Sequence, residues 1–213
     1  MNFFLLHGIF SGVIANWRCN MIDSRLIESI KLGDEGAFET LYSLYKDKIY
    51  RTCWLITKDS CAAEDVLQEV FIKVYQKINK LKEPEAFQAW VYKITINCCI
   101  KHIKKYKASC AIVADDSFNE ISEVNPCYMP EDSLMKNEFN KRVMKLISEL
   151  PLEKKTTVIL YYFNDLSIKE IAKVMNCFEG TVKSRLHNSK KILGNKIIAS
   201  NNIGEEGMTY EYR

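Results

Sequence analysis

The chain of 213 residues carries 30 lysines and arginines and 27 aspartates and glutamates, which gives a formal net charge of +3. Hydrophobic residues make up 47% of it and charged residues 27%, a composition that excludes an intrinsically disordered chain. This length allows one large domain or two small ones. A net charge of +3 does not by itself indicate nucleic-acid binding, so the distribution of the charges matters more.

Basic residues gather in two segments. Residues 93–107 contain five lysines and no acid, and residues 179–196 contain five basic residues and one acid. Between them, residues 108–138 contain seven acids and one lysine. Two basic patches separated by an acidic segment suggest two contacts with a polyanion, joined by a stretch that avoids it.

The first twenty residues form an apolar segment unlike the rest of the chain. The segment is similar to the core of a signal peptide, but no basic residue precedes its apolar run. His7, Gly8 and Gly12 interrupt this run, which is too short to span a bilayer. We expect residues 1–20 to come from a start codon assigned too early, with translation beginning at Met21. A membrane-associated tail is the alternative.

Residues 24–107 are predicted to be helical. Apolar residues recur at helical spacing in four segments, and the third, with Val66, Val70 and Val74, is apolar over more than half its circumference. We therefore place this third helix at the centre of a bundle. Asp59 is a candidate cap for it, and Pro84 suits the first turn of the fourth helix. No alternating strand pattern occurs, so the predicted fold class is all-α.

The third helix also carries a mostly polar stripe opposite its valines. Asp65, Gln68, Glu69 and Ile72 lie three or four residues apart, so they share one face. Such a stripe suits contacts with a partner helix, although an ordinary solvated face has the same pattern. The carboxylates are accompanied by no histidine, nucleophile or glycine loop, so we exclude acid-base catalysis.

The fourth helix ends in a lysine cluster that suits phosphate binding. The DNA-facing residues expected along it are Lys93, Asn97, Lys101, Lys104 and Lys105. Aromatic side chains here could also stack on unpaired bases. Trp90 lies within the apolar stripe and is expected in the core, whereas Tyr92 lies off that stripe and is the better stacking candidate.

Residues 108–131 are predicted to be a flexible acidic linker, because they contain two prolines and no sustained apolar period. A stretch of this length without structure is typical between two domains and unusual within one. Residues 132–196 are expected to form a second helical domain, in which Pro151 ends the first helix. Residues 197–213 are expected to be a flexible tail.

The second domain contains a helix-turn-helix pattern. Ser167 and Glu170 form a capping box at the start of a short helix, which a tight turn at residues 176–178 ends. A second helix begins near Glu179 and buries Val182 and Leu186. Its other face carries Thr181, Lys183, Ser184, Arg185, His187, Asn188, Lys190 and Lys191. Such a helix fits the major groove of DNA, although many solvated helices have a similar face.

The eight cysteines follow no CxxC or zinc-binding spacing. Most lie in apolar helical stripes, where a free thiol acts as a small hydrophobic group. We expect reduced thiols in a cytoplasmic protein, with no metal and no cofactor. A thiol sensor that uses Cys98 and Cys99, or Cys110, is the alternative.

Two parts of the chain resemble one protein family. The segments LSIKEIA (166–172) and EGTVKSRLH (179–187) resemble the C-terminal domain of sigma factors, most of all the extracytoplasmic-function (ECF) group of the sigma-70 family. The segments DVLQEVF (65–71) and AFQAWVYKI (86–94) resemble the N-terminal domain of the same group. The two resemblances occur in the family's order and together cover most of residues 24–193.

The resemblance implies a role for each half. Residues 21–107 would be sigma region 2, which binds polymerase and recognises and melts the minus-10 element, and residues 132–196 would be sigma region 4, which reads the minus-35 element. The implied upstream-element residues are Ser167, Thr181, Lys183, Ser184, Arg185, His187 and Lys190. The implied downstream-element residues are Tyr92, Lys93, Asn97, Lys101, Lys104 and Lys105. The implied contacts with a coiled coil of the polymerase β′ subunit are Asp65, Gln68, Glu69 and Ile72.

The resulting prediction is an alternative sigma factor, a non-enzymatic subunit that brings polymerase to chosen promoters. Its expected partners are core RNA polymerase, through the β′ and β subunits, promoter DNA and an anti-sigma factor. We expect no small-molecule substrate and no stable homo-oligomer. A conventional helix-turn-helix regulator that acts without polymerase is the alternative, but it leaves residues 65–71 and 86–94 unexplained. A third hypothesis, an enzyme or thiol-redox protein, requires a metal or a thiol of low pKa.

Overall fold

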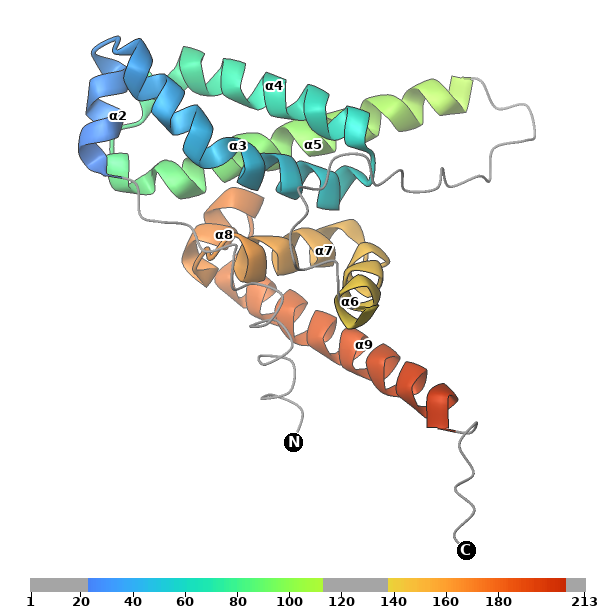
Figure 1. The fold of residues 1–213 in the computed structure, drawn as a ribbon. Coiled ribbons are helices and arrows are strands. Elements are labelled where there is room, and N and C mark those ends of the chain that lie inside the picture. The colour runs from blue at the N-terminus through green and yellow to red at the C-terminus, as the bar shows by residue number, and fades with distance from the viewer. Residues whose placement is uncertain (1–22, 113–137, 206–213) are drawn as a thin grey trace, which may run out of the picture.

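The computed structural model describes residues 23–112 and 138–205, which form two helical halves (Figure 1). The first half consists of α2 (Ser24–Lys31), α3 (Glu35–Thr57), α4 (Ser60–Lys77), the short 3-10 helices η1 (Ile78–Lys80) and η2 (Pro84–Ala86), and α5 (Phe87–Ile112). The second consists of α6 (Glu138–Ser148), α7 (Leu152–Val158), the π-helical turn η4 (Ile159–Phe163), α8 (Ile168–Met175) and α9 (Glu179–Glu205). Neither described range contains a strand, and the prediction of an all-α fold with two helical regions is confirmed.

Aspartates cap the first helices of the chain. Asp23, Asp34 and Asp59 each precede a helix, and each carboxylate accepts a hydrogen bond from a backbone N–H of the first turn, at 2.8–3.0 Å. The predicted cap at Asp59 is therefore confirmed. Such a bond satisfies one of the backbone donors that the first turn of a helix leaves unpaired.

The valines of α4 are buried as expected, and α4 packs against both other long helices of the first half, as the prediction of a central place in that bundle required. Val66, Val70 and Val74 are fully buried against α3 and α5. In Figure 1, α3 and α5 lie between α4 and the second half. The apolar content of α4 reflects burial on a broad inner side, and its polar stripe lies on the outside of the bundle.

The second half is organised by local signals that the sequence contains. Ser167 and Glu170 form the predicted capping box, in which the Ser167 hydroxyl accepts from the Glu170 N–H and the Glu170 carboxylate accepts from the Ser167 N–H. Helix α8 ends at Met175 and is capped by Asn176, whose φ of 50° is left-handed, and the Cys177 N–H then bonds to the Ala172 carbonyl at 3.0 Å. This short turn leads directly into α9.

The long helices extend further than expected. Helix α5 continues to Ile112, into the predicted linker, and α9 continues to Glu205, beyond the predicted domain end at residue 196. The predicted extension at residues 1–20, most of the predicted linker and the end of the predicted tail lie outside the described residues. Within the described ranges, no helix combines the length and the apolarity that crossing a bilayer requires.

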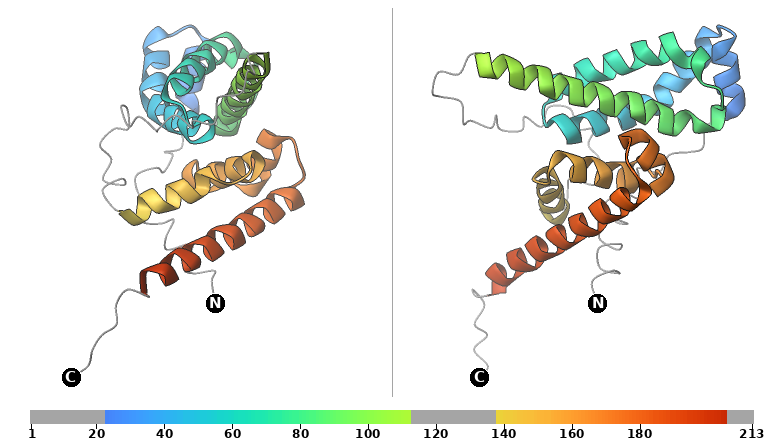
Figure 2. Two further views of the ribbon diagram at one scale, coloured as in Figure 1. Left: turned by 90° about the vertical axis from the view of Figure 1, so that its right-hand side faces the viewer. Right: turned by 180° about the vertical axis from the view of Figure 1, so that it is seen from behind.

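The two halves pack directly against each other. Helix α8 lies against α5, and α7 contacts α3. Figure 2 shows α3 and α5 on one side of this contact and α9 on the far side of the second half. The sequence predicted two domains but contained no local signal for this packing.

Removing the capping hydroxyl of Ser167 should destabilise the second half. Ser167→Ala is expected to lower the free energy of unfolding by about 1 kcal/mol, measured by chemical denaturation, because an N–H at the start of α8 loses its partner. Ser43→Ala, at an exposed position inside α3, is the matched control and should change it by less than about 0.5 kcal/mol. Equal effects of the two substitutions would contradict the capping role.

Candidate nucleic-acid interface

The exposed side of α9 forms a polar surface that we call the outer face of α9. It consists of Lys183, Ser184, His187, Asn188 and Lys191, all of them exposed. Their spacing of three and four residues places them along one side of the helix. The Asn188 amide lies 3.5 Å from the Ser184 hydroxyl, so two groups that can read base edges are adjacent.

The opposite side of α9 is anchored in the second half. Val182, Leu186 and Leu193 are buried, and α9 packs against α6, α7 and α8. The Ser189 hydroxyl, also buried, donates to the Arg185 carbonyl at 2.7 Å. This apolar anchoring directs the outer face of α9 away from the rest of the molecule.

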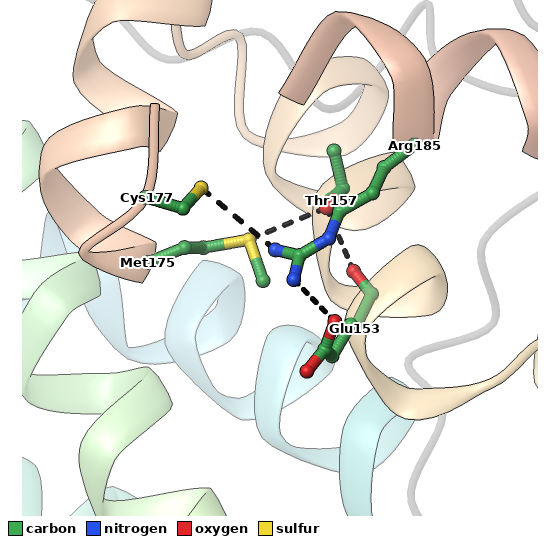
Figure 3. A network of polar contacts seen from close by, with 5 residues as sticks. All are labelled: Glu153, Thr157, Met175, Cys177 and Arg185. Atoms are coloured by element: carbon green, nitrogen blue, oxygen red, sulfur yellow. Dashed lines mark hydrogen bonds and ion pairs between the residues drawn. The ribbon is translucent and has the colours of Figure 1, made fainter. Parts of the chain in front are cut away.

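Arg185, which was expected to face DNA, does not belong to the outer face of α9. Its side chain is only 18% exposed and forms an ion pair with the Glu153 carboxylate of α7 (Figure 3). A second guanidinium nitrogen lies 3.8 Å from the Cys177 sulfur, in the turn before α9. Arg185 therefore connects α9 both to α7 and to the turn of the helix-turn-helix.

Further contacts brace this connection. The Thr157 hydroxyl on α7 donates to the Glu153 carbonyl at 2.7 Å and lies 3.3 Å from the sulfur of Met175, at the end of α8. Figure 3 shows the five side chains converging between α7, the turn and α9. The network joins α9 to both preceding helices, and Arg185 is one of the residues that hold α9 in this position.

The other expected upstream-element residues differ in exposure. Lys190 is half-buried, and its ammonium lies 5.9 Å from the centre of the Tyr162 ring, where burial lowers the pKa of the lysine. Thr181 is half-buried, and its N–H bonds to the Phe178 carbonyl at 2.9 Å. The Ser167 hydroxyl is engaged in the capping box. Lys183, Ser184 and His187 thus remain as exposed residues on the outer face of α9.

Phe178 is a feature that the sequence reading missed. Its side chain is 86% exposed and lies directly before the first residue of α9. A phenylalanine at the tip of such a helix can make an apolar contact with a thymine methyl group in the major groove. The available signal was a large apolar residue in a turn, outside the buried stripes of both helices.

A second basic surface, the lysine face of α5, lies in the first half. It consists of Lys93, Asn97, Lys101, Lys104 and Lys105, all of them exposed. Lys101 also lies 3.5 Å from the Glu69 carboxylate of α4. Five neighbouring polar groups of which four are cationic can contact successive phosphates.

The expectation that Tyr92 is available for stacking is wrong for this conformation. Tyr92 is completely buried, because α5 is covered by α3, α4 and α8 on different sides. Trp90 is half-buried, with its ring 5.9 Å from that of Phe87. Both aromatics therefore belong to the packing of α5, as was expected only for Trp90.

The polar stripe of α4 is exposed at Asp65, Gln68 and Ile72. Glu69 is engaged within the protein instead: its carboxylate accepts from the Lys73 ammonium at 2.6 Å, and this bond lowers the pKa of Glu69. Tyr75, three residues after Ile72, is exposed as well and was not expected in the stripe. The exposed stripe is thus more apolar at its C-terminal end than the sequence reading proposed.

The buried cysteines of the first half do not resemble a thiol sensor. Burial raises the pKa of Cys53 and of Cys98, although the Lys73 ammonium lies 3.2 Å from the Cys98 sulfur. A raised pKa keeps a thiol protonated and unreactive. The Cys110 side chain lies outside the described residues, among which no cluster suitable for a metal ion occurs.

Comparison with known families gives two matches. The family model described as Sigma-70 region 2 matches residues 41–109, and the model described as Sigma-70, region 4 matches residues 140–193. The two matches cover the lysine face of α5 and the outer face of α9, respectively.

Curated relatives match over nearly their whole length. The ECF RNA polymerase sigma factor SigW of Bacillus subtilis is 32% identical over 81% of this chain and 95% of its own. The RNA polymerase sigma-H factor of Pseudomonas aeruginosa is 31% identical over 80% of this chain and 91% of its own. The ECF RNA polymerase sigma-E factor of Haemophilus influenzae is 30% identical over 83% of this chain and 96% of its own.

Solved structures share the fold. CnrH, in a structure with the cytosolic domain of CnrY, superposes with a TM-score of 0.61 over 83% of this chain and 97% of its own, at 16% identity. The sigma factor RpoE of Bartonella quintana, in a structure with the anti-sigma factor NepR, superposes with a TM-score of 0.60 and 20% identity. The superposition covers 74% of this chain and 94% of that one.

Exchanging the charges of Arg185 and Glu153 tests whether Arg185 positions α9 through this ion pair or contacts DNA bases itself. Arg185→Glu alone should weaken duplex binding and lower the free energy of unfolding by up to about 1 kcal/mol, because two carboxylates then meet. The double variant with Glu153→Arg should recover most of both losses, as measured by denaturation and by DNA titration.

Lys183→Glu is the control on the outer face of α9. It should weaken DNA binding and change the free energy of unfolding by less than about 0.5 kcal/mol, and Glu153→Arg should not rescue it. If the exchanged pair regains stability but stays defective in binding, Arg185 contacts DNA directly.

Proposed function

The chain belongs to the ECF group of RNA polymerase sigma factors in the sigma-70 family, and we propose that its two halves share the selection and opening of promoters between them. As an alternative sigma factor, it directs transcription from a chosen set of promoters. Sigma factors are not enzymes, so the chemistry belongs to the polymerase. What remains to be assigned is which surface of this chain contacts which partner.

The outer face of α9 is proposed to read the upstream (minus-35) element. Its support is the geometry of a helix anchored by Val182 and Leu186, with exposed lysine, serine, histidine and asparagine side chains on the other side. Lysines there hold phosphates and the remaining groups meet base edges, which is the usual division between affinity and specificity. Residues 132–196 would then act as the upstream-element domain.

The lysine face of α5 is proposed to hold the downstream (minus-10) element. Four of its five residues are lysines, which supply phosphate affinity without choosing a sequence. Tyr92 is buried, so none of the five residues of this face is an aromatic that could stack on a base. Residues 21–107 would form the domain that carries this contact and the contact with polymerase.

The exposed stripe of α4 is proposed to contact the β′ subunit of core polymerase. Asp65 and Gln68 offer hydrogen-bond acceptors, and Ile72 and Tyr75 add apolar area beside them. A mixed surface of this kind is typical of contacts that form and dissociate. The second half would contact the β subunit, and the complex would act in the cytoplasm.

An anti-sigma factor is a further proposed partner. CnrH was solved with the cytosolic domain of CnrY and RpoE with the anti-sigma factor NepR. We propose that a protein of this class binds the present chain and masks its polymerase-binding surfaces. A conventional regulator acting without polymerase is not favoured, because the relatives match across both halves and are named as sigma factors.

Run-off transcription with core polymerase tests the function. The full chain should initiate from a subset of a promoter library, and this subset should share two spaced elements. Core polymerase alone and the chain alone are the controls. If the chain never joins the polymerase yet shifts duplex DNA by itself, it is a regulator of the conventional type.

The salt dependence of DNA binding tests the lysine face of α5. Lys104→Gln and Lys105→Gln should each reduce the slope of log affinity against log salt by about 0.9, because each lost phosphate contact releases fewer counterions. Lys77→Gln, at the exposed end of α4, is the charge-matched control and should leave the slope unchanged. The measurement uses polymerase-bound protein on promoter duplexes. If the Lys104 and Lys105 variants keep the slope of the Lys77 control, these two lysines do not contact DNA phosphates.

A further inference from the structure

Two residues at the start of α9 are poor choices for the helix that they begin. Phe178, which is 86% exposed, directly precedes α9, and Gly180 is the second residue of the helix and is exposed too. Gly180 lies four residues before Ser184, so it continues the outer face of α9 towards the N-terminal end. We call Phe178, Glu179 and Gly180 the tip of α9.

Phe178 occupies the capping position of α9. Its carbonyl accepts from the N–H groups of Thr181 and Val182, at 2.9 and 3.2 Å. Serine, threonine, aspartate and asparagine are favoured at this position, because their side-chain oxygens accept from N–H groups of the first turn. The chain follows this preference at α2, α3 and α4, with aspartates, and at α8, with a serine. A phenylalanine has no such oxygen, so the capping of α9 does not explain its presence.

The fold does not require a glycine at position 180 either. The φ of Gly180 lies outside the left-handed region, and a Cβ added to it would meet no neighbouring atom of the described residues within 4 Å. Alanine would therefore fit, and it favours a helix more than glycine does. A glycine under these conditions is expected where another molecule comes close to the backbone.

Charge distinguishes the tip from the rest of the outer face of α9. The charged side chain of the tip is that of Glu179, which is exposed, whereas Lys183 and Lys191 follow along the helix. A carboxylate is favourable at the start of a helix, so Glu179 has an explanation within the protein. Because a carboxylate repels phosphates, the tip suits the edges of bases better than the DNA backbone.

The backbone around Phe178 is held in place. The Cys177 N–H bonds to the Ala172 carbonyl at 3.0 Å, and the Cys177 sulfur lies 3.8 Å from a guanidinium nitrogen of Arg185 (Figure 3). The first turn of α9 then begins at the Phe178 carbonyl. An aromatic side chain on a fixed backbone has only two rotatable bonds, so a contact through its ring costs little conformational entropy.

An exposed phenyl ring at this place suits one feature of DNA. The N-terminal residues of a recognition helix are those that contact base edges in the major groove. Most groups on these edges are hydrogen-bond donors and acceptors, and the apolar one is the C5-methyl group of thymine. A contact between the ring and this methyl group removes apolar surface of both from water.

We propose that the tip of α9 enters the major groove of the upstream element, where Phe178 packs against the C5-methyl group of one thymine and Gly180 permits the close approach. Phe178 then determines which promoters are selected, whereas the lysines of the outer face of α9 supply affinity. This inference rests on the proposed function, because it requires that α9 reads the upstream element.

Replacing thymines of the upstream element by deoxyuridine, one at a time, tests the contact. The exchange removes the methyl group and keeps the base pair. The probes are duplexes with an upstream element that the wild-type chain and core polymerase select from the promoter library. Wild-type protein bound to core polymerase should lose about fourfold in affinity at one of these thymines, the equivalent of one buried carbon. Phe178→Ser should bind the thymine and the uracil duplex equally.

The controls separate reading from folding. Leu32→Ala is the matched control, because Leu32 is 88% exposed in the turn after α2, and it should keep the wild-type response to uracil. Phe178→Ser should melt at the wild-type temperature or above it, since serine is a favoured cap. Phe178→Leu keeps an apolar side chain without the ring and should show a smaller uracil response than the wild type. It serves if circular dichroism shows that Phe178→Ser is misfolded.

Gly180→Ala should change stability and binding in opposite directions. It should raise the Tm by about 2 °C, because alanine favours the helix. It should weaken promoter binding by about tenfold, because the added methyl group intrudes on the contact with DNA. Gly36 is likewise exposed and the second residue of a helix, α3. Gly36→Ala is therefore the matched control and should raise the Tm without changing promoter affinity.

Each outcome decides a separate point. If no thymine of the upstream element responds to uracil, or if Phe178→Ser keeps the wild-type response, Phe178 reads no methyl group. A Gly180→Ala variant with wild-type promoter affinity excludes the close approach. If Phe178→Ser loses core polymerase and Phe178→Leu keeps the full uracil response, the ring belongs to a protein interface.

Failure of the sigma function has a different signature. In that case the wild-type chain initiates from no member of the library with core polymerase. The same uracil exchange on duplexes that the chain binds by itself then decides the contact of Phe178. A wild type that initiates normally but does not respond to uracil contradicts the role of the tip alone.

Discussion

Helix α8 is packed on both sides, against α5 of the first half and against α9 of the second, and the arrangement of the molecule depends on this sandwich. It has only eight residues, too few to be stable as an isolated helix. Its place is therefore determined by its capping box and by the burial of Ile171, Ala172 and Val174. Any movement of α8 changes the relation between the two basic surfaces.

Basic residues in this sigma factor serve two different purposes. Lys183 and Lys104 are exposed, where phosphates can reach them, whereas Arg185 and Lys155 are directed inwards at a carboxylate and a carbonyl. Arg185 suits its role because a guanidinium can contact Glu153 and Cys177 with separate nitrogens. The inward residues hold the helices in place, and the outward ones remain available to DNA.

The contact between the halves combines packing of α8 and α7 against α5 and α3 with buried hydrogen bonds. A large apolar interface would hold the halves together permanently, because separation would expose it to water. A hydrogen bond such as that between Asn164 and Thr52 costs less free energy to break, because water can replace each partner.

The amino-acid sequence by itself determined the helices, the cap at Asp59, the capping box at Ser167 and Glu170, and the family, because these depend on residues three or four positions apart and on short motifs. Only the tertiary structure decided that Arg185 pairs with Glu153 and that Tyr92 is buried. Which flank of a helix is covered depends on neighbours distant in sequence: α7 beside Arg185, and α3, α4 and α8 around α5. The contact between Asn164 and Thr52 joins residues 112 positions apart, a separation that helical periodicity does not report.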